Sequence, residues 1–192
     1  MSAADSVAPV PGGPFEQPRA QRLRELASDI AGAAYLRGDF VLSSGTRSDY
    51  YFDKYLFETK PSILRRVASL LTELIPADVD RLAGPELGSV ALATALSLES
   101  GLPFVIVRKG GREYDSSRLV EGELYKRERV LVVEDVVSTG AQAIDAADRL
   151  QVAGAKVTGI IAVIDREQGG PENIAAAGHH FDALFRRSEL DL

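Results

Sequence analysis

The stretch from Val130 to Ile144 decides the fold, and it reads Val-Leu-Val-Val-Glu-Asp-Val-Val-Ser-Thr-Gly-Ala-Gln-Ala-Ile. Its four leading apolar residues predict a strand over Val130–Glu134, buried as in a parallel sheet that is covered on both faces. After a short polar turn, the sequence predicts a helix over Gly140–Ala153, which ends before Gly154. This strand-turn-helix order is the unit from which α/β sheets are built.

The same alternation of strands and helices extends in both directions from this stretch. Further strands are predicted over 81–83, 104–108, 156–164 and 181–185, and further helices over 89–100 and 171–177. Together these elements predict the α/β fold class, with a doubly wound, mainly parallel sheet that carries helices on both faces. In such a sheet, ligands bind at the carboxyl ends of the strands.

The residues before this alternation predict a small N-terminal hood. A helix is expected over 19–36, with Gly38 just past its end, followed by short extended segments at 40–42 and 50–53. A helix over 61–74 then begins the core, so the single domain of residues 19–192 divides into a hood of 19–60 and a core of 61–192. Residues 1–18 hold four prolines and two glycines but little that could form a core, and we expect a disordered tail there.

Composition excludes several classes of function. The 192 residues include no Cys and only two His, which excludes disulfides, thiolate zinc sites, a Cys nucleophile and a histidine-rich metal site. The formal net charge of −6 argues against a protein that binds nucleic acid over its whole surface. No apolar run reaches the roughly 18 residues of a membrane span, and no signal-peptide pattern opens the chain. We therefore expect a cytoplasmic protein without a membrane or nucleic-acid partner.

The turn after the predicted strand has the chemistry of a phosphate site. Ser138, Thr139 and Gly140 open a helix whose free N–H groups and dipole attract an anion, and Gly140 leaves room for its approach. Glu134 and Asp135 cannot bind phosphate, but carboxylates suit sugar hydroxyls or a hydrated Mg²⁺. The combination points to a phosphorylated sugar with a metal. The alternative is that Ser138 only caps the helix and the two acids end the strand in solvent.

Three other segments fall at the same predicted edge of the sheet. The loop after residue 108 carries Arg112 and Tyr114 among glycines, as a lid over a pyrophosphate would, although acidic residues nearly cancel its charge. The turn Gly84–Gly88 could turn backbone N–H groups toward the same group. Arg166 follows a strand and could face a carboxylated base, or it could simply be solvated. No P-loop or dinucleotide-binding glycine motif occurs in the sequence.

The stretch at 130–144 resembles the 5-phosphoribosyl 1-pyrophosphate (PRPP) motif of type I phosphoribosyltransferases. Four further segments are similar to the orotate phosphoribosyltransferase family, and they are Leu42–Phe52, Val107–Lys109, Arg118–Gly122 and Asp165–Gly170. Three positions depart from the family pattern. Ser43 stands where many bacterial members have Lys, Arg112 replaces a Lys of the loop, and Asp115 replaces a Gly.

The resemblance implies transfer of the phosphoribosyl group from PRPP to orotate in pyrimidine biosynthesis, with Mg²⁺ held mainly through PRPP and water. It assigns catalytic roles to Lys109, Arg112 and Asp135, and it places Glu134 and Asp135 in the outer shell of the metal. The residues it assigns to PRPP are Arg108, Lys109, Arg112, Tyr114, Glu134, Asp135, Val136, Val137, Ser138, Thr139, Gly140, Ala141 and Gln142. Those it assigns to orotate are Ser138, Arg166, Tyr51 and Phe52. It also implies a homodimer whose 108–122 loop reaches the neighbouring active site.

Two alternatives remain open on the sequence. The protein could transfer the phosphoribosyl group to another base, and Arg166 argues against this because a neutral purine needs no cation. It could also be a regulator that binds PRPP without turnover, which the altered loop residues Arg112 and Asp115 would allow. The sequence contains no helix-turn-helix extension, which argues against such a regulator.

Overall fold

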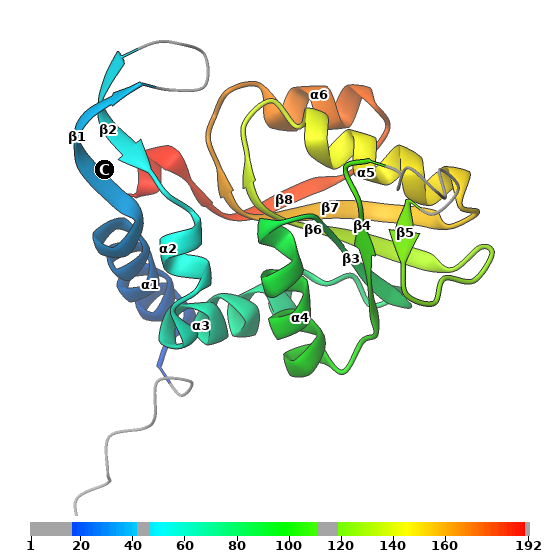
Figure 1. Ribbon diagram of the computed structural model, residues 1–192. Coiled ribbons are helices and arrows are strands. Elements are labelled where there is room, and N and C mark those ends of the chain that lie inside the picture. The colour runs from blue at the N-terminus through cyan, green and yellow to red at the C-terminus, as the bar shows by residue number, and fades with distance from the viewer. Residues whose placement is uncertain (1–16, 42–46, 111–118, 191–192) are drawn as a thin grey trace, which may run out of the picture.

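A six-stranded sheet forms the centre of the protein in this computed structural model, which describes residues 17–41, 47–110 and 119–190 (Figure 1). The strands lie in the order β5-β4-β3-β6-β7-β8. Their bounds are β3 (Arg81–Pro85), β4 (Phe104–Val107), β5 (Val120–Glu121), β6 (Arg129–Val137), β7 (Lys156–Asp165) and β8 (Phe181–Arg186). All neighbouring pairs are parallel except β5, which runs antiparallel to β4 inside the predicted loop. The predicted doubly wound, mainly parallel sheet is confirmed.

Helices cover both faces of this sheet (Figure 1). One face carries α5 (Ala141–Val152) and α6 (Gly170–Ala176), and the other carries α3 (Pro61–Leu71) and α4 (Gly88–Ser100). Strand β6 shows why its sequence is continuously apolar. Val130 and Val132 pack into the α5 side, whereas Leu131 and Val133 pack into the α4 side, so both faces of the strand are buried.

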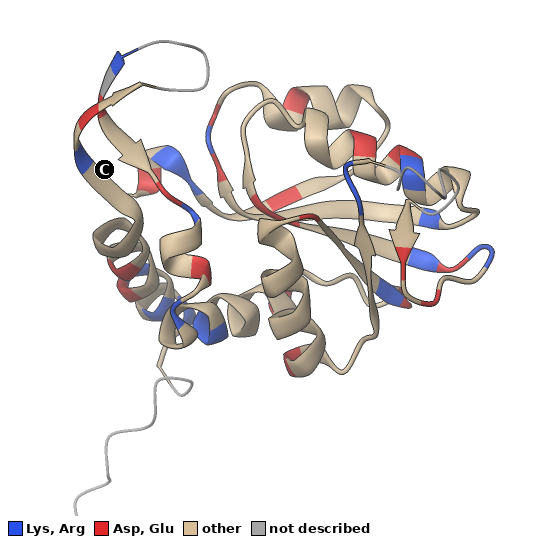
Figure 2. Ribbon diagram, viewed as in Figure 1, with Lys and Arg blue, Asp and Glu red and all other residues tan. Residues whose placement is uncertain are grey.

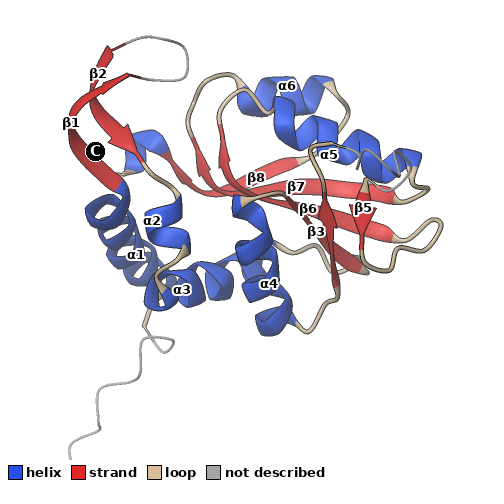
Figure 3. Ribbon diagram, in the orientation of Figure 1, coloured by secondary structure: helices blue, strands red, loops and turns tan. Residues whose placement is uncertain are grey.

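The hood consists of α1 (Arg19–Ala34), the antiparallel hairpin of β1 (Tyr35–Val41) and β2 (Arg47–Phe52), and the short helix α2 (Tyr55–Glu58) (Figure 3). The predicted helix over 19–36 is two residues too long, because Tyr35 and Leu36 pair with β2 instead. Gly38 therefore lies inside β1 and does not follow a helix end. Helix α2 was not predicted, and the helix expected over 61–74 finishes as a 3-10 turn at Thr72–Leu74.

Apolar and charged contacts hold the hood against the core. Leu26 and Ile30 of α1 belong to the same buried cluster as side chains of α3, α4 and β7. Arg22 of α1 pairs at 3.1 Å with Glu73, which lies in the 3-10 turn after α3. Figure 2 shows charged segments of α1 and α3 side by side. The hood is thus packed against the α4 face of the sheet, with its hairpin extending past the strand ends (Figure 1).

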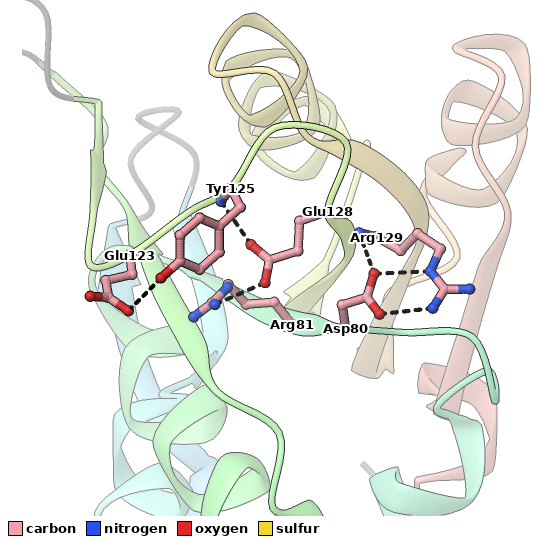
Figure 4. A network of polar contacts seen from close by, with 6 residues as sticks. All are labelled: Asp80, Arg81, Glu123, Tyr125, Glu128 and Arg129. Carbon is pink, nitrogen blue, oxygen red and sulfur yellow. Dashed lines mark hydrogen bonds and ion pairs between the residues drawn. The ribbon is translucent and has the colours of Figure 1, made fainter.

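A polar network lies at the amino ends of β3 and β6, at the edge of the sheet opposite the carboxyl ends of the strands (Figure 4). Arg129 donates to both carboxylate oxygens of Asp80 at 2.8 and 2.9 Å, and these bonds hold the pKa of Asp80 below its ordinary value. Arg81 pairs with Glu128 at 2.8 Å and lies beside the ring of Tyr125. The network ties the segment before β6 to the start of β3. It leaves the carboxyl edge as the face that the hood overhangs.

The remaining predictions on organisation concern the tail and the membrane. For residues 1–16, the predicted disordered tail lies outside the described residues. Within the described ranges, none of the helices has the length and apolar character that crossing a membrane requires.

Candidate active site

The sheet has its topological switch point between β3 and β6. These strands are neighbours, yet the chain leaves β3 toward β4 on one side and leaves β6 toward β7 on the other. The connections therefore diverge at the carboxyl ends, which opens the crevice where doubly wound sheets bind ligands. The turns after β3 and after β6 both lie at this point.

A cavity of about 980 Å³ lies between the hood and the carboxyl ends of β6 and β7. Both parts of the protein line it, so the hood forms one wall and the core the other. The lining residues most relevant to binding are Tyr51, Phe52 and Lys54 from the hood and Ser138, Gln142 and Arg166 from the core.

The turn at 138–140 leaves the first N–H groups of α5 without a side-chain cap from the described residues. The alternative in which Ser138 caps the helix is therefore not what the structure shows, and the helix start is open to an anion. Gly140 has a positive φ of 80°, and a Cβ there would lie 2.8 Å from Cγ1 of Ile174 in α6. The glycine is thus required by backbone conformation and helix packing, a different reason from the predicted room for an anion.

The two acids of the motif are buried inside β6. The strand continues through Val137, because Val136 and Val137 pair with β7, so the predicted end at Glu134 is wrong. Glu134 and Asp135 are 2% and 1% exposed, which also contradicts the alternative of acids in solvent. Ser89 Oγ donates to Glu134 Oε2 at 2.7 Å. Burial, together with the charge of Asp135, raises the pKa of Glu134 to about 7.

Asp135 is paired with a cation from the hood. Lys54 Nζ lies 2.6 Å from Asp135 Oδ2, and the backbone N–H of Val136 donates to Oδ1 at 2.5 Å. Burial lowers the pKa of Lys54, but the charge and hydrogen bond of Asp135, together with the charges of Glu58 and Tyr55, outweigh burial and raise the pKa above its ordinary value. Beside them, burial and the neighbouring Asp135 raise the pKa of Glu58 to about 8. A proton on Glu58 is thus favoured at neutral pH.

The end of β4 fixes the start of the predicted loop. The side chain of Arg108 lies between Glu86 and Glu121, at 3.8 and 3.5 Å. Glu86 Oε1 also accepts a 2.7 Å hydrogen bond from the N–H of Lys109, and Arg149 donates to the carbonyl of Arg108 at 2.6 Å. The base of the loop is therefore tied both to the turn after β3 and to α5.

The predicted base-binding residues Arg166, Tyr51 and Phe52 all line the cavity, and Phe52 also packs against the core. Arg166 follows β7, its N–H donates to the carbonyl of Val137 at 2.8 Å, and its side chain lines the cavity. Tyr51 is 42% exposed, with its ring 5.6 Å from that of Phe40. Phe52 also lines the cavity but packs against the core, with its ring centroid 6.3 Å from that of Phe57.

Comparison with known proteins agrees with this geometry. Residues 57–178 match the family model of the phosphoribosyl transferase domain. Orotate phosphoribosyltransferase of Methanocella arvoryzae is 47% identical over 153 residues, which cover 80% of this chain and 87% of that protein. The chain belongs to the orotate phosphoribosyltransferase family. The enzyme of that name from Nocardioides sp. is 41% identical over 166 residues, covering 86% of this chain and 93% of the relative.

Solved structures of orotate phosphoribosyltransferases have the same fold. The Mycobacterium tuberculosis protein in complex with PRPP superposes with a TM-score of 0.77 at 31% identity, over 89% of this chain and 99% of that one. The Aeropyrum pernix protein superposes with a TM-score of 0.74 at 29% identity, over 89% and 94%. The predicted resemblance to orotate phosphoribosyltransferase is confirmed, and the protein is a pentosyltransferase.

Some of the residues that the family resemblance assigns to the site line the cavity, and others lie outside it. Ser138, Gln142, Val136, Arg166 and Tyr51 line the cavity. Val137 is the buried last residue of β6, Thr139 lies in the turn, and Ala141 begins α5. Glu134 and Asp135 lie buried in β6, whereas Arg108 and Lys109 lie at the end of β4. Arg112 and Tyr114 fall outside the described residues.

Three residues of the site were not predicted from the sequence. Lys54 and Glu58 approach Asp135 from the hood, and Ser89 binds Glu134 from α4. The one signal in the sequence is the spacing of Lys54 and Glu58, four residues apart around the aromatic and apolar residues 55–57. That spacing places both side chains on one side of a helical turn.

The acid motif offers few free oxygen ligands to Mg²⁺. Among the described residues, no three His, Cys, Asp or Glu side chains are grouped so as to hold a metal ion. Asp135 already has partners on both oxygens, while Glu134 Oε1 is buried without one. This donor set fits a metal that enters with the substrate and its water better than one that the protein binds directly.

Proposed function

We propose that this protein transfers the 5-phosphoribosyl group of PRPP to orotate, in a Mg²⁺-dependent reaction in the cytoplasm. The observation that carries the proposal is the shared cavity, which Ser138, Gln142 and Arg166 line together with the aromatic residues of the hood. An anion site and a cation for a carboxylated base therefore border the same cavity. The Mycobacterium tuberculosis relative, whose structure contains PRPP, supports the same assignment.

Each part of the cavity has a proposed task. The open N-terminus of α5, residues 138–142, holds the 5′-phosphate through backbone N–H groups. Arg166, with Ser138, pairs with the planar orotate, whose carboxylate suits the fork of a guanidinium. Tyr51 and Phe52 form the surface on which the base lies. Arg166 gives no advantage with a neutral purine, so its place in the cavity favours orotate over another base.

The pyrophosphate is assigned to the end of β4 and the loop that follows it, with Arg108, Lys109, Arg112 and Tyr114. Glu86 supports this role because it holds both Arg108 and the N–H of Lys109. We further propose a homodimer in which the 108–122 loop of one subunit serves the site of the other.

The reaction breaks the C1′–oxygen bond to pyrophosphate and forms a C1′–nitrogen bond to orotate, whose ring nitrogen gives up its proton to the departing pyrophosphate. Positive charge develops on the ribose ring, and negative charge develops on the leaving group. Lys109 and Arg112 stabilise the leaving group, and Asp135 faces the ribose, so positioning and electrostatics supply the catalysis. Bound Mg²⁺ would neutralise charge at the pyrophosphate, and Glu134 and Asp135 would hold it through its water.

The activity is tested by the loss of orotate absorbance when purified protein, PRPP and Mg²⁺ are mixed. Loss that requires all components supports the proposal, and omission of Mg²⁺ tests the metal separately. If PRPP binds in a calorimeter but orotate is not consumed, pyrophosphate release with a panel of bases separates another base from a regulator without turnover.

The shared site is tested by mixing two inactive variants. Lys109→Ala alters the loop and Asp135→Asn alters the acid motif of β6, so a mixed dimer has one intact site if the loop acts across subunits. Random exchange should then restore about a quarter of the wild-type activity. No recovery after confirmed subunit exchange would contradict the shared site.

A further inference from the structure

Two side chains of the hood meet the acid motif of the core. Lys54 and Glu58 lie four residues apart at either end of α2, and both reach Asp135, which is 81 residues from Lys54 along the chain. This contact brings the hood directly to the strand that opens the phosphate site.

The ion pair fixes the Asp135 carboxylate. Its Oδ2 atom accepts from Lys54 Nζ at 2.6 Å and its Oδ1 atom accepts from the N–H of Val136 at 2.5 Å. Asp135 is 1% exposed, whereas the side chain of Lys54 is 29% exposed and lines the cavity. A buried carboxylate needs a partner for its charge, and among the described contacts Lys54 is the cation that supplies it.

The start of α4 encloses the same carboxylate from another side. A Cβ on Gly88 would lie 2.1 Å from Asp135 Oδ2 and 3.0 Å from each carboxyl oxygen of Glu58. Ser89 Oγ accepts from the N–H of Asp135 at 3.2 Å. The acid group thus has little space to adopt another rotamer, and the hood contributes the ammonium of Lys54 on its Oδ2 atom.

We propose that Lys54 is a positioning residue for PRPP: its ammonium holds Asp135 in the orientation that receives the phosphoribosyl group. The inference rests on the proposed role of Asp135 toward the ribose. It makes the hood part of PRPP binding as well as the wall beside the base. Lys54 acts through Asp135 and is not assigned a contact of its own with the reacting atoms.

The first test compares Lys54→Met with Lys54→Arg, and Lys60→Met serves as control because Lys60 is an exposed lysine of the same hood. Calorimetry with PRPP and Mg²⁺ alone measures PRPP affinity, and steady-state kinetics measures KM for PRPP and for orotate. Loss of a hydrogen-bonded charge predicts PRPP affinity about tenfold or more weaker in Lys54→Met. KM for orotate should change far less, Lys54→Arg should recover most of the affinity, and Lys60→Met should stay within about twofold of wild type.

A double-mutant cycle distinguishes positioning from direct contact. If Lys54 acts through Asp135, Asp135→Asn combined with Lys54→Met binds PRPP as Asp135→Asn alone does, within about twofold. Losses that multiply would overturn the proposal and assign Lys54 a contact with substrate. Unchanged PRPP affinity in folded Lys54→Met would overturn it as well.

A second variant of Lys54 and calorimetry on the wild-type protein complete the test. If Lys54→Met does not fold, Lys54→Gln takes its place, because its amide can still donate to Asp135 but carries no charge. Its PRPP affinity is expected between those of wild type and Asp135→Asn, and wild-type affinity would contradict the need for charge. Because calorimetry needs no turnover, wild-type protein that binds PRPP but consumes no orotate would refute the proposed function and leave the role of Lys54 testable.

Discussion

The buried Glu58 should make the stability of this protein depend on pH in a way that one substitution removes. The carboxyl group is 2% exposed, and burial beside Asp135 raises its pKa from 4.5 to about 8. In the unfolded chain the group ionises near its ordinary pKa. Between these values the folded state therefore binds more protons than the unfolded state, and the free energy of unfolding falls as pH rises.

The size of this effect follows from the difference in pKa. A difference of one in pKa corresponds to about 1.4 kcal/mol of unfolding free energy. The rise of the Glu58 pKa from 4.5 to about 8 therefore limits the change in unfolding free energy to about 5 kcal/mol. The charges of Asp135 and Lys54 act on the pKa of Glu58 in opposite directions, so we expect roughly half of that, about 2–3 kcal/mol. Glu58→Gln places a neutral donor of the same shape at the site. Its stability relative to wild type should rise by this amount between pH 4.5 and pH 8.

The assay is chemical denaturation of wild type and Glu58→Gln at pH values from 4.5 to 8.5. The control is Glu99→Gln, since Glu99 is an exposed carboxylate on α4. Its stability should follow the wild-type curve at a constant offset. Parallel curves for wild type and Glu58→Gln would show that Glu58 titrates alike in both states, and the burial argument would be refuted.

Three further substitutions test other parts of the site. Gly88→Ala should cost about 1–3 kcal/mol of stability and weaken PRPP binding, because its Cβ would overlap the Asp135 carboxylate. The control is Gly32→Ala on α1, which has open space around it. In the same denaturation experiment, it should be neutral or stabilising by up to about 1 kcal/mol. Lys109→Ala should lower kcat by about a hundredfold or more, and turnover within about threefold of wild type would remove Lys109 from the mechanism. Arg166→Ala should raise KM for orotate by about tenfold to a hundredfold with little change for PRPP, and equal changes in both KM values would contradict its assignment to the base.

The sheet could be predicted because its sequence signals are local. The continuous apolar run of β6 reflects burial on both faces, and the polar turn after it marks the start of α5. Errors arose where pairing between distant residues overrides local preference. Tyr35 continues the helical pattern of α1 but pairs with Phe52, and the resulting hairpin turns Gly38 into a strand residue.

The acid motif shows a deeper limit of sequence reasoning. Two adjacent acids after an apolar strand suggest exposure, because carboxylates are rarely buried without partners. The partners here come from elsewhere: Lys54 from the hood and Ser89 from α4. A motif of fifteen residues could therefore predict the type of ligand but not the partners of its own carboxylates, which meet them only when the hood and α4 pack around β6. This dependence is why the variants of Lys54 and Glu58, outside the motif, are the sharpest tests of how the motif functions.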